Sequence, residues 1–389
     1  MLRYQHEYAF MLILYTQYLI CVVCIGMRTL VTMVQDKLVG IAEIADFAGV
    51  SKQAVSNWRM RYDHFPRPIQ NLQSGPVWDR EKVEEWVKGH KGEETHVLSF
   101  INLKGGVGKT TTAVAVAELL AQEERKHVLV VDLDPQTNAT VSLISEERWA
   151  EMDDTGRTVA QLFADKLDAH EGPNFEVEAA LARRVSTIND GIARLDLLPS
   201  SIRLIELQDR IPMIALSGNF MSNPLEILRA GLQSVLDRYD YVVIDCPPSL
   251  GTVTKNGLRI SSGYVIPTIP DIVSTWGIYQ IVDNVARFAD DIGREIPALG
   301  IVATKVQKNG LHDRVIKDLR AARLGRFGES GSLAQPPLLG TAIPQTVQVA
   351  RGADVDADIR TFKGKYGSAY EPLRTLTQEI KEICESKKR

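Results

Sequence analysis

The stretch from Lys104 to Thr111, with the sequence KGGVGKTT, constrains the fold of this chain more than any other. It follows residues 97–103, whose apolar run predicts a strand, and precedes residues 113–121, whose alanines, valines and leucines predict a helix. A strand, a glycine-rich turn and a helix in this order gather free backbone N–H groups and a helix N-terminus around one small volume. The stretch therefore predicts a phosphate-binding loop in an α/β fold.

The residue types of this loop fit a nucleotide. Its glycines permit backbone conformations and close approaches that a Cβ would prevent. Lys109 is expected to bring its charge to the β and γ phosphates, and Thr110 to place its hydroxyl at Mg²⁺. A turn of this kind that binds nothing is the alternative, but the strand before it and the helix after it favour the phosphate loop. The predicted nucleotide-binding residues are Lys104, Gly105, Gly106, Val107, Gly108, Lys109, Thr110 and Thr111.

Length and composition set the wider frame. A chain of 389 residues exceeds what one core usually holds, so two domains are expected. The net charge of -4 gives no global attraction for nucleic acid, so any DNA binding must come from local patches. The four cysteines indicate a reducing, cytoplasmic compartment without a disulfide framework.

The N-terminal stretch is unusual for such a protein. Residues 8–27 contain no charged side chain and could by their length span a bilayer. A membrane anchor, a signal peptide and an upstream extension of a protein that starts at Met27 or Met33 are the three interpretations. Only Arg3 provides a basic residue ahead of the apolar run, and no clear cleavage site follows it. We expect residues 1–33 to be a mis-assigned start or a disordered extension.

Residues 34–91 predict a small DNA-binding domain. Apolar side chains recur at helical spacing in residues 41–48, Gly49 ends this helix, and Ser51 can cap a second helix over residues 52–61. Two short helices joined by a tight turn, the second polar and basic outside, are typical of a helix-turn-helix, whose second helix enters the major groove. The residues expected to contact DNA are Lys52, Gln53, Ser56, Asn57 and Arg59.

The segment that follows extends this pattern. Short extended pieces over residues 65–78 precede a helix over residues 80–88, and the whole resembles the winged helix-turn-helix domains of the MerR and excisionase type. A helical hairpin used for dimer contacts, with a solvated basic face, is the alternative. Residues 92–96 are short and polar, and are expected to link this domain to a second one, residues 97–389.

Two further apolar strands of the second domain end in acids. Residues 128–132 lead to Asp134, and residues 239–245 end at Asp245. Buried strands that alternate with helices predict a doubly wound, mostly parallel sheet, which binds ligands beyond the carboxyl ends of its strands. Lys109 and both acids should therefore meet at one edge of the sheet.

These two acids have expected roles in phosphoryl transfer. Asp245 is placed to hold Mg²⁺ together with Thr110, and Asp134 is placed to orient or deprotonate the attacking water. Either acid alone could instead be a helix cap or a turn former. Their occurrence together with the phosphate loop favours the catalytic interpretation.

Three motifs together resemble the ParA/Soj/MinD group of deviant Walker ATPases. They are the loop from Lys104 to Thr111, the segment DLDPQ at 132–136, and the segment IDCPPSLG at 244–251. The resemblance runs over most of residues 97–350 and implies ATP and Mg²⁺ as ligands and a homodimer that forms on ATP binding. Lys104 resembles the signature lysine that reaches the partner subunit's nucleotide, where a second cation offsets developing charge. With Asp134, it is the expected catalytic residue.

The resemblance also implies a function. It points to a ParA-type DNA-partitioning ATPase whose ATP-bound dimer binds nonspecific DNA of the nucleoid, and whose hydrolysis a ParB-type centromere-binding protein stimulates. The helix-turn-helix would add a contact to operator DNA. A MinD-like membrane-positioning ATPase and a small-molecule synthetase of the same superfamily are the alternatives.

Two helical patterns near the C-terminus each allow two interpretations. A basic stripe could hold DNA phosphates without reading sequence, or could be a solvated face. It comprises Arg314, Lys317, Arg320 and Arg323. An apolar stripe in the last helix could bind a membrane, as in MinD-type proteins, but we expect it to pack in the core. It comprises Leu373, Leu376, Ile380 and Ile383.

Overall fold

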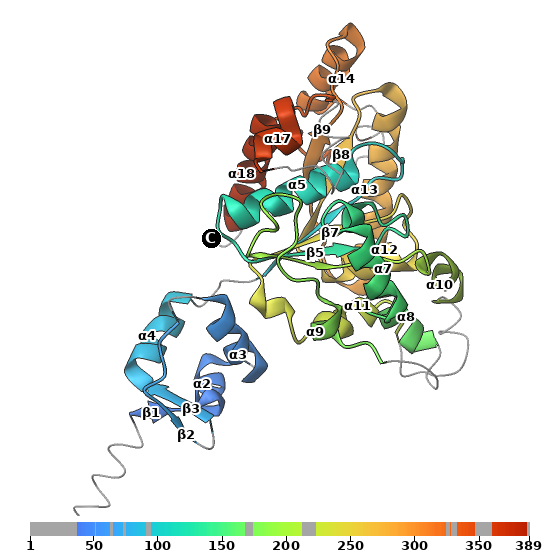
Figure 1. Cartoon of the computed structure of the whole chain (residues 1–389). Helices are drawn as coiled ribbons and strands as arrows, with labels where there is room; N and C mark the ends of the chain where they lie inside the picture. The colour runs from blue at the N-terminus through green and yellow to red at the C-terminus, as the bar shows by residue number, and fades with distance from the viewer. Residues whose placement is uncertain are drawn as a thin grey trace, which may run out of the picture. The chain divides into compact units, whose positions relative to one another are not determined.

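The chain divides into two compact units between Glu93 and Glu94 (Figure 1). The structure is a computed structural model that describes residues 37–50, 52–62, 65–72, 75–90, 95–167, 174–211, 223–323, 327, 333–346 and 360–386. The predicted extension, residues 1–33, lies outside the described residues, as does most of the expected linker.

The first unit packs helices against a small antiparallel sheet of strand order β1-β3-β2. Gly49, with a φ of 72°, ends α2 in the left-handed conformation that glycine adopts without strain. The buried Trp78 of β3 lies at the centre and donates its Nε1–H to the Pro66 carbonyl over 2.9 Å. The elements are β1 (Leu38–Val39), α2 (Ile41–Ala48), α3 (Lys52–Arg61), β2 (Gln70–Leu72), β3 (Gly75–Asp79) and α4 (Arg80–His90).

The second unit is built on a six-stranded sheet in which every pairing is parallel. Its strand order is β6-β5-β7-β4-β8-β9, so the chain winds outward from the middle in both directions. This confirms the predicted α/β fold with a parallel sheet. The strands are β4 (His96–Phe100), β5 (Val128–Asp132), β6 (Leu195–Leu198), β7 (Tyr241–Asp245), β8 (Gly263–Thr268) and β9 (Ala298–Ala303).

Helices cover both faces of this sheet. Successive strand side chains point to opposite faces, so Val242 of β7 belongs to one apolar core and Val243 to the other. The core around Val243 contains residues of α5 (Lys109–Gln122), α7 (Glu146–Asp154) and α18 (Tyr370–Ser386). The core around Val242 contains residues of α8 (Val159–Leu167), α10 (Leu204–Arg210), α11 (Ile227–Leu232), α12 (Thr252–Ile260) and α13 (Ile272–Ile292).

The shorter elements complete the connections between strands and helices. They are α6 (Asn138–Val141), α9 (Val177–Ala180), α14 (Gly310–Arg320), α17 (Phe362–Tyr366), and the 3₁₀ turns η2 (Leu236–Arg238) and η3 (Gly367–Ala369). The register pairs Asp245 with both Phe100 and Asp132, so β4, β5 and β7 end at the same level. The segments after these three strands therefore meet at one edge.

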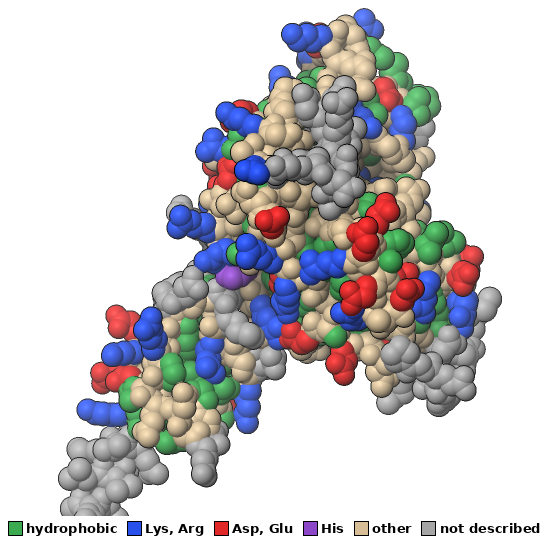
Figure 2. Space-filling model, viewed as in Figure 1, with side chains coloured by type: hydrophobic (Ala, Val, Ile, Leu, Met, Phe, Trp, Pro, Cys, Tyr) green, Lys and Arg blue, Asp and Glu red, His purple; other side chains and the backbone are tan. Residues whose placement is uncertain are grey.

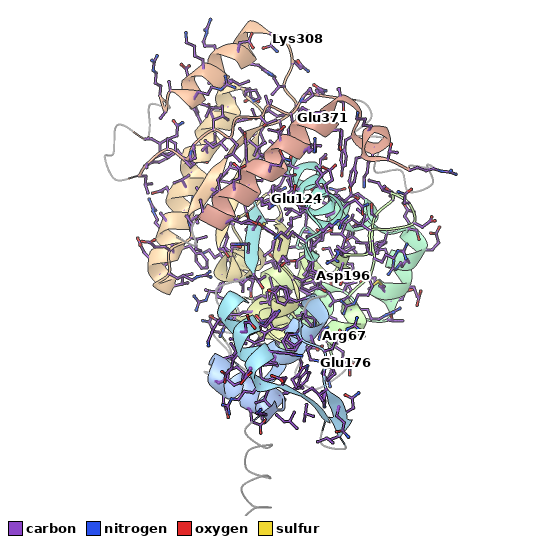
Figure 3. All side chains as sticks on the ribbon, turned by 90° about the vertical axis from the view of Figure 1, so that its left-hand side faces the viewer. Arg67, Glu124, Glu176, Asp196, Lys308 and Glu371 are labelled. Atoms are coloured by element: carbon purple, nitrogen blue, oxygen red, sulfur yellow. The ribbon has the colours of Figure 1, made fainter. Side chains whose placement is uncertain are left out.

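The last helix, α18, packs its apolar stripe into the core. Leu373, Leu376 and Ile380 are fully buried, as expected, and Ile383 is partly buried. Figure 3 shows Glu124, which follows α5, close to α18, where Lys381 forms an ion pair with it. In the described part of the chain, no helix has the length and apolar character that crossing a membrane requires.

Candidate functional site: a phosphate-binding loop and its cavity

The loop between β4 and α5 has the backbone shape that its glycines permit. Gly106 has a φ of 73° and Gly108 a φ of 79°, both in the left-handed region that strains other residues. Gly108 is the N-cap of α5, so the free N–H groups of the first helical turn face the loop. This geometry favours a bound anion.

Side chains from neighbouring strands hold the loop in place. The Thr304 hydroxyl, directly after β9, donates to the Val107 carbonyl over 2.6 Å. The Asn102 side chain donates to the Pro267 carbonyl over 2.7 Å and accepts from the Lys104 N–H over 2.9 Å. No motif marks either positioning residue in the sequence; the position of Thr304 at the end of an apolar strand is the available signal.

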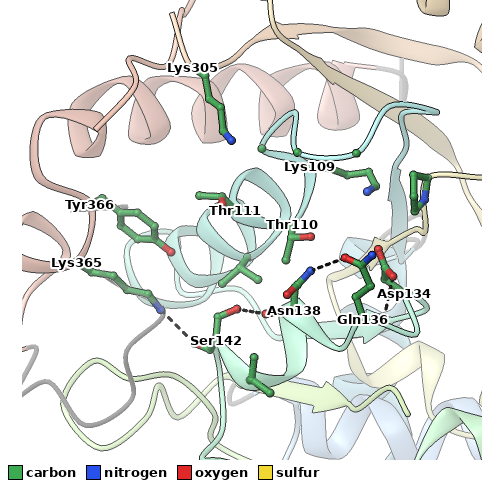
Figure 4. Close-up of a pocket in the computed structure, with 16 residues that line it drawn as sticks. Lys109, Thr110, Thr111, Asp134, Gln136, Asn138, Ser142, Lys305, Lys365 and Tyr366 are labelled. Atoms are coloured by element: carbon green, nitrogen blue, oxygen red, sulfur yellow. Dashed lines mark hydrogen bonds between the residues drawn. The ribbon is translucent and has the colours of Figure 1, made fainter. Parts of the chain in front are cut away.

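The loop borders a cavity of about 320 Å³ (Figure 4). Of the predicted nucleotide-binding residues, Lys104 and Val107 are not among those that line it. Val107 is fully buried and contributes its carbonyl to the Thr304 hydrogen bond instead. The loop residues that line the cavity are Gly105, Gly106, Gly108, Lys109, Thr110 and Thr111.

The two predicted acids lie where the strand ends meet. Asp134 lines the cavity, and its Oδ1 accepts from the Gln136 N–H over 3.0 Å. Asp245 is fully buried, and neither of its carboxylate oxygens has a hydrogen-bond partner in the described part of the chain. Burial raises the pKa of the Asp245 carboxyl, and the positive charge of Lys109 partly offsets this rise. The structure thus brings Lys109, Asp134 and Asp245 together, as expected from the strand ends.

Asp132, at the end of β5, holds the backbone at Asp134 through hydrogen bonds. It accepts hydrogen bonds from the Thr140 hydroxyl over 2.7 Å, the Thr140 N–H over 2.9 Å and the Asp134 N–H over 3.0 Å. Burial, followed by the negative charge of Asp245, raises the pKa of Asp132. Its hydrogen bonds fix the backbone at Asp134, a positioning role that the sequence analysis did not assign.

Lys104 points away from the cavity of its own chain. Its Nζ donates to the Asp271 carboxylate over 3.2 Å and to the Ser274 hydroxyl over 3.0 Å. Asp271 is the N-cap of α13, and Ser274 lies in the first turn of that helix. The Lys104 side chain remains 42% exposed. Lys104 therefore lies at the surface, beside the nucleotide cavity.

The cavity has a second end that the sequence analysis did not find. In Figure 4, Lys109 and Asp134 lie at one end, and Lys365 and Tyr366 of α17 lie at the other. Lys305, two residues after β9, also lines the cavity. No motif marks Lys365 or Tyr366, because more than 250 residues of sequence separate them from the loop.

The predicted DNA-contacting residues of α3 divide into two groups. Lys52 and Arg59 are exposed and Ser56 is half-buried, whereas the Gln53 side chain lies outside the description. Asn57 is fully buried, so the expectation that it contacts DNA is wrong. Asn57 follows the buried Ala54 by three residues and therefore lies on the inner face of the helix.

The predicted basic stripe is exposed on the second unit. Arg314, Lys317 and Arg320 are exposed on α14, and Arg323 follows the end of that helix. Figure 2 shows Lys and Arg side chains at the tip of this unit, where α14 lies. Asp313 is exposed beside them. These exposed basic side chains are thus accessible to a phosphate backbone.

A glycine-rich loop between a parallel strand and a helix, with buried acids at two neighbouring strand ends, defines a P-loop nucleoside triphosphatase. A family model described as an AAA domain matches residues 95–297. The sporulation initiation inhibitor protein Soj of Bacillus subtilis is 30% identical over 68% of this chain and 96% of its own length. The chain belongs to the ParA/Soj-type family of P-loop ATPases.

Other relatives agree with this assignment. The chromosome partitioning protein ParA of Caulobacter vibrioides is 28% identical over 73% of this chain and 93% of its own. Among solved structures, cobyrinic acid a,c-diamide synthase from Mycobacterium smegmatis, with a bound ATP analogue and magnesium, covers 75% of this chain and 96% of its own at a TM-score of 0.56 and 24% identity. A protein described as a plasmid partition protein from Borrelia burgdorferi, bound to AMPPNP, covers 76% of this chain and 100% of its own at a TM-score of 0.53 and 20% identity. These two structures share the fold.

Proposed function

We propose that this chain is a DNA-partitioning ATPase that takes ATP and Mg²⁺ and works as a nucleotide-dependent dimer. ATP closes two chains against each other, the closed dimer binds nonspecific DNA, and a ParB-type partner stimulates hydrolysis and release. The relatives Soj and ParA support the partition role. The observation that carries the switch is the position of Lys104 outside the cavity of its own chain.

The Lys104 side chain has the properties that a contact in trans requires. It is half exposed, and its present partners, Asp271 and Ser274, belong to the start of α13 rather than to the nucleotide cavity. A partly exposed ion pair of this kind contributes little to stability, about 0–1 kcal/mol. Lys104 can therefore leave Asp271 at low cost when a second chain presents a triphosphate.

The residues around Asp245 fit a divalent cation. A buried carboxylate without hydrogen-bond partners is costly to maintain, and a cation held by it and by the Thr110 hydroxyl would compensate that cost. Mg²⁺ would neutralise charge that develops on the β and γ phosphates. Lys109 is positioned by the first turn of α5 to bind the same phosphates.

Asp134 has the geometry of a residue that orients water. Its Oδ1 is engaged by the Gln136 N–H, while its backbone is fixed by Asp132 and by the Ser200 hydroxyl, which donates to the Asp134 carbonyl over 2.8 Å. A carboxylate fixed in this way at the cavity wall can hold a water molecule beside the terminal phosphate. We assign this role to Asp134.

The first unit supports a contact to specific DNA. Two short helices joined at a left-handed glycine, followed by an antiparallel hairpin of β2 and β3, match the plan of a winged helix-turn-helix. Lys52 and Arg59 of α3 are exposed for such a contact. Operator binding by this unit would allow the protein to repress its own operon, and the basic residues of α14 would serve nonspecific, nucleoid-associated binding.

Replacing Lys104 with alanine tests the switch. Wild-type chain should bind nonspecific DNA only with ATP present, and K104A should lose this ATP-dependent binding because the dimer no longer closes. Lys126, whose ion pair with Glu385 is also partly exposed, provides the control K126A, which should bind as the wild type does. Undiminished, ATP-dependent DNA binding by K104A would remove the switch from the account.

Neither alternative function gains support from the structure. For the membrane-positioning alternative, the apolar stripe of α18 is buried, and the N-terminal apolar run that would serve as its anchor lies outside the described residues. The synthetase reading rests on a structural likeness at 24% identity, which extends to the fold alone.

A further inference from the structure

The end of the cavity opposite the phosphate loop is bounded by α17. Tyr366 and Lys365 line it together with Val114 of α5 and Ser142, which follows α6. Figure 4 shows both α17 side chains well separated from Lys109 and Asp134 across the cavity. If the phosphates of a nucleotide bind at the loop end, the α17 end is the part of the cavity that remains for its nucleoside.

Helix α5 runs along the cavity from the phosphate loop toward α17. Thr110 and Thr111 in its first turn line the phosphate end, and Val114, one turn later, lines the middle. Glu118 is a further turn along, and each turn advances about 5.4 Å. The helix that holds the phosphates at its N-terminus therefore also carries, about two turns later, the residue to which α17 is attached.

That attachment is a buried polar network centred on Glu118. The Glu118 carboxylate is fully buried and accepts from Lys365 Nζ over 2.7 Å, from the Tyr366 hydroxyl over 2.6 Å and from the Ser186 hydroxyl over 2.6 Å. Charges are costly to bury, so such a network persists only with complete, well-directed hydrogen bonds. It fixes the place of the Tyr366 ring and the Lys365 stem at the cavity wall.

We propose that Lys365 and Tyr366 form the nucleoside-end wall of this site and determine its affinity for the purine nucleoside part of the nucleotide. The inference rests on this cavity being the nucleotide site, but not on DNA binding or dimerisation. Tyr366 is almost fully buried and stacks against Phe362, so a purine ring or ribose would meet only the part of its ring that lines the cavity.

Comparing ATP with inorganic tripolyphosphate separates the two ends of the cavity. Both are titrated into the full chain with Mg²⁺, as competitors of a fluorescent ATP analogue. If Tyr366 contacts the nucleoside, Y366A should weaken ATP binding by about tenfold, which is about 1.4 kcal/mol. The same variant should leave tripolyphosphate binding unchanged. Y366F, which keeps the ring, should retain most of the ATP affinity.

Tyr370 provides the matched control. Its hydroxyl donates to the carboxylate of Glu123, the C-cap residue of α5, over 2.6 Å, but Tyr370 does not line the cavity. Y370A should leave the affinity for both ligands unchanged. If Y366A does not fold, Y366L, which keeps apolar bulk without the aromatic face, should weaken ATP binding alone by a smaller factor.

Three results would overturn the assignment: unchanged ATP affinity in Y366A or Y366L, equal losses for ATP and tripolyphosphate, or equal effects of the Tyr366 and Tyr370 variants. Failure of the partition function would look different. In that case the wild-type chain would still bind ATP more tightly than tripolyphosphate, while K104A would bind DNA as the wild type does.

Discussion

At the scale of single residues, burial decides which side chains can act. Lys109, Asp134 and Asp245 are all buried, yet they meet at one edge of the sheet, where Lys109 and Asp134 line the cavity, because the loop and two strand ends bring them there. The sequence sufficed to predict this convergence, since apolar strands that end in acids have one arrangement in a parallel sheet. It did not suffice for Asn57, because polar residue type alone does not say on which face of a helix a side chain packs.

Replacing Asp245 with asparagine should separate stability from activity. The substitution removes a buried carboxylate that has no hydrogen-bond partner among the described residues, so we expect the metal-free free energy of unfolding to rise by about 1 kcal/mol. Mg²⁺-dependent ATP hydrolysis should fall by about 100-fold or more, because the cation loses its anchor. Urea unfolding in a chelator and steady-state hydrolysis measure the two effects. A variant that is less stable but hydrolyses ATP normally would contradict the role of Asp245.

Asn57 and Lys52 should respond differently to substitution. N57A removes a buried polar side chain and should lower the free energy of unfolding of the first unit by about 1–3 kcal/mol. K52A removes an exposed charge and should leave that stability unchanged while weakening operator DNA binding. Chemical unfolding and DNA titration of both variants provide the comparison. A stable N57A with selectively lost DNA binding would restore the original expectation for Asn57.

At the scale of elements, the sequence predicted α2, α3, α4, α5 and α18, but it did not predict the longest helix, α13. The four-residue apolar stripe of α18 and the alternating cores on the two sheet faces follow from spacing alone. Short elements were not predictable in the same way. Helix α17 has five residues, too few for a periodic pattern, and its place at the cavity is set by the long-range network around Glu118.

The packing of α18 gives a second comparison between variants. L376A leaves a cavity in the core and should lower the free energy of unfolding by about 2–5 kcal/mol. K381A breaks only the partly exposed ion pair with Glu124 and should cost about 0–1 kcal/mol. Unfolding curves of the isolated variants measure both. A well-tolerated L376A would show that the stripe is available for another surface, as the membrane interpretation requires.

At the scale of the whole molecule, the sequence predicted the sheet, the loop and the triad of Lys109, Asp134 and Asp245. It could not predict the contacts between segments far apart in sequence, such as Lys104 with Asp271, or Lys365 with Glu118. These contacts depend on how helices from the second half of the chain return to the loop. The proposed roles of Lys104 in a nucleotide-dependent dimer and of Lys365 at the nucleoside end of the cavity both depend on these contacts.

The central claim is that Lys104 acts on the nucleotide of a second chain, and mixing two inactive variants tests it most directly. K104A keeps its own Asp134, and D134A keeps its own Lys104, so a mixed dimer contains one complete site if Lys104 acts in trans. ATP hydrolysis by an equimolar mixture, with DNA and the partner protein present, should then recover to on the order of one quarter of the wild-type rate, because half of the dimers are mixed and each has one complete site. A mixture as inactive as its two components would contradict the account.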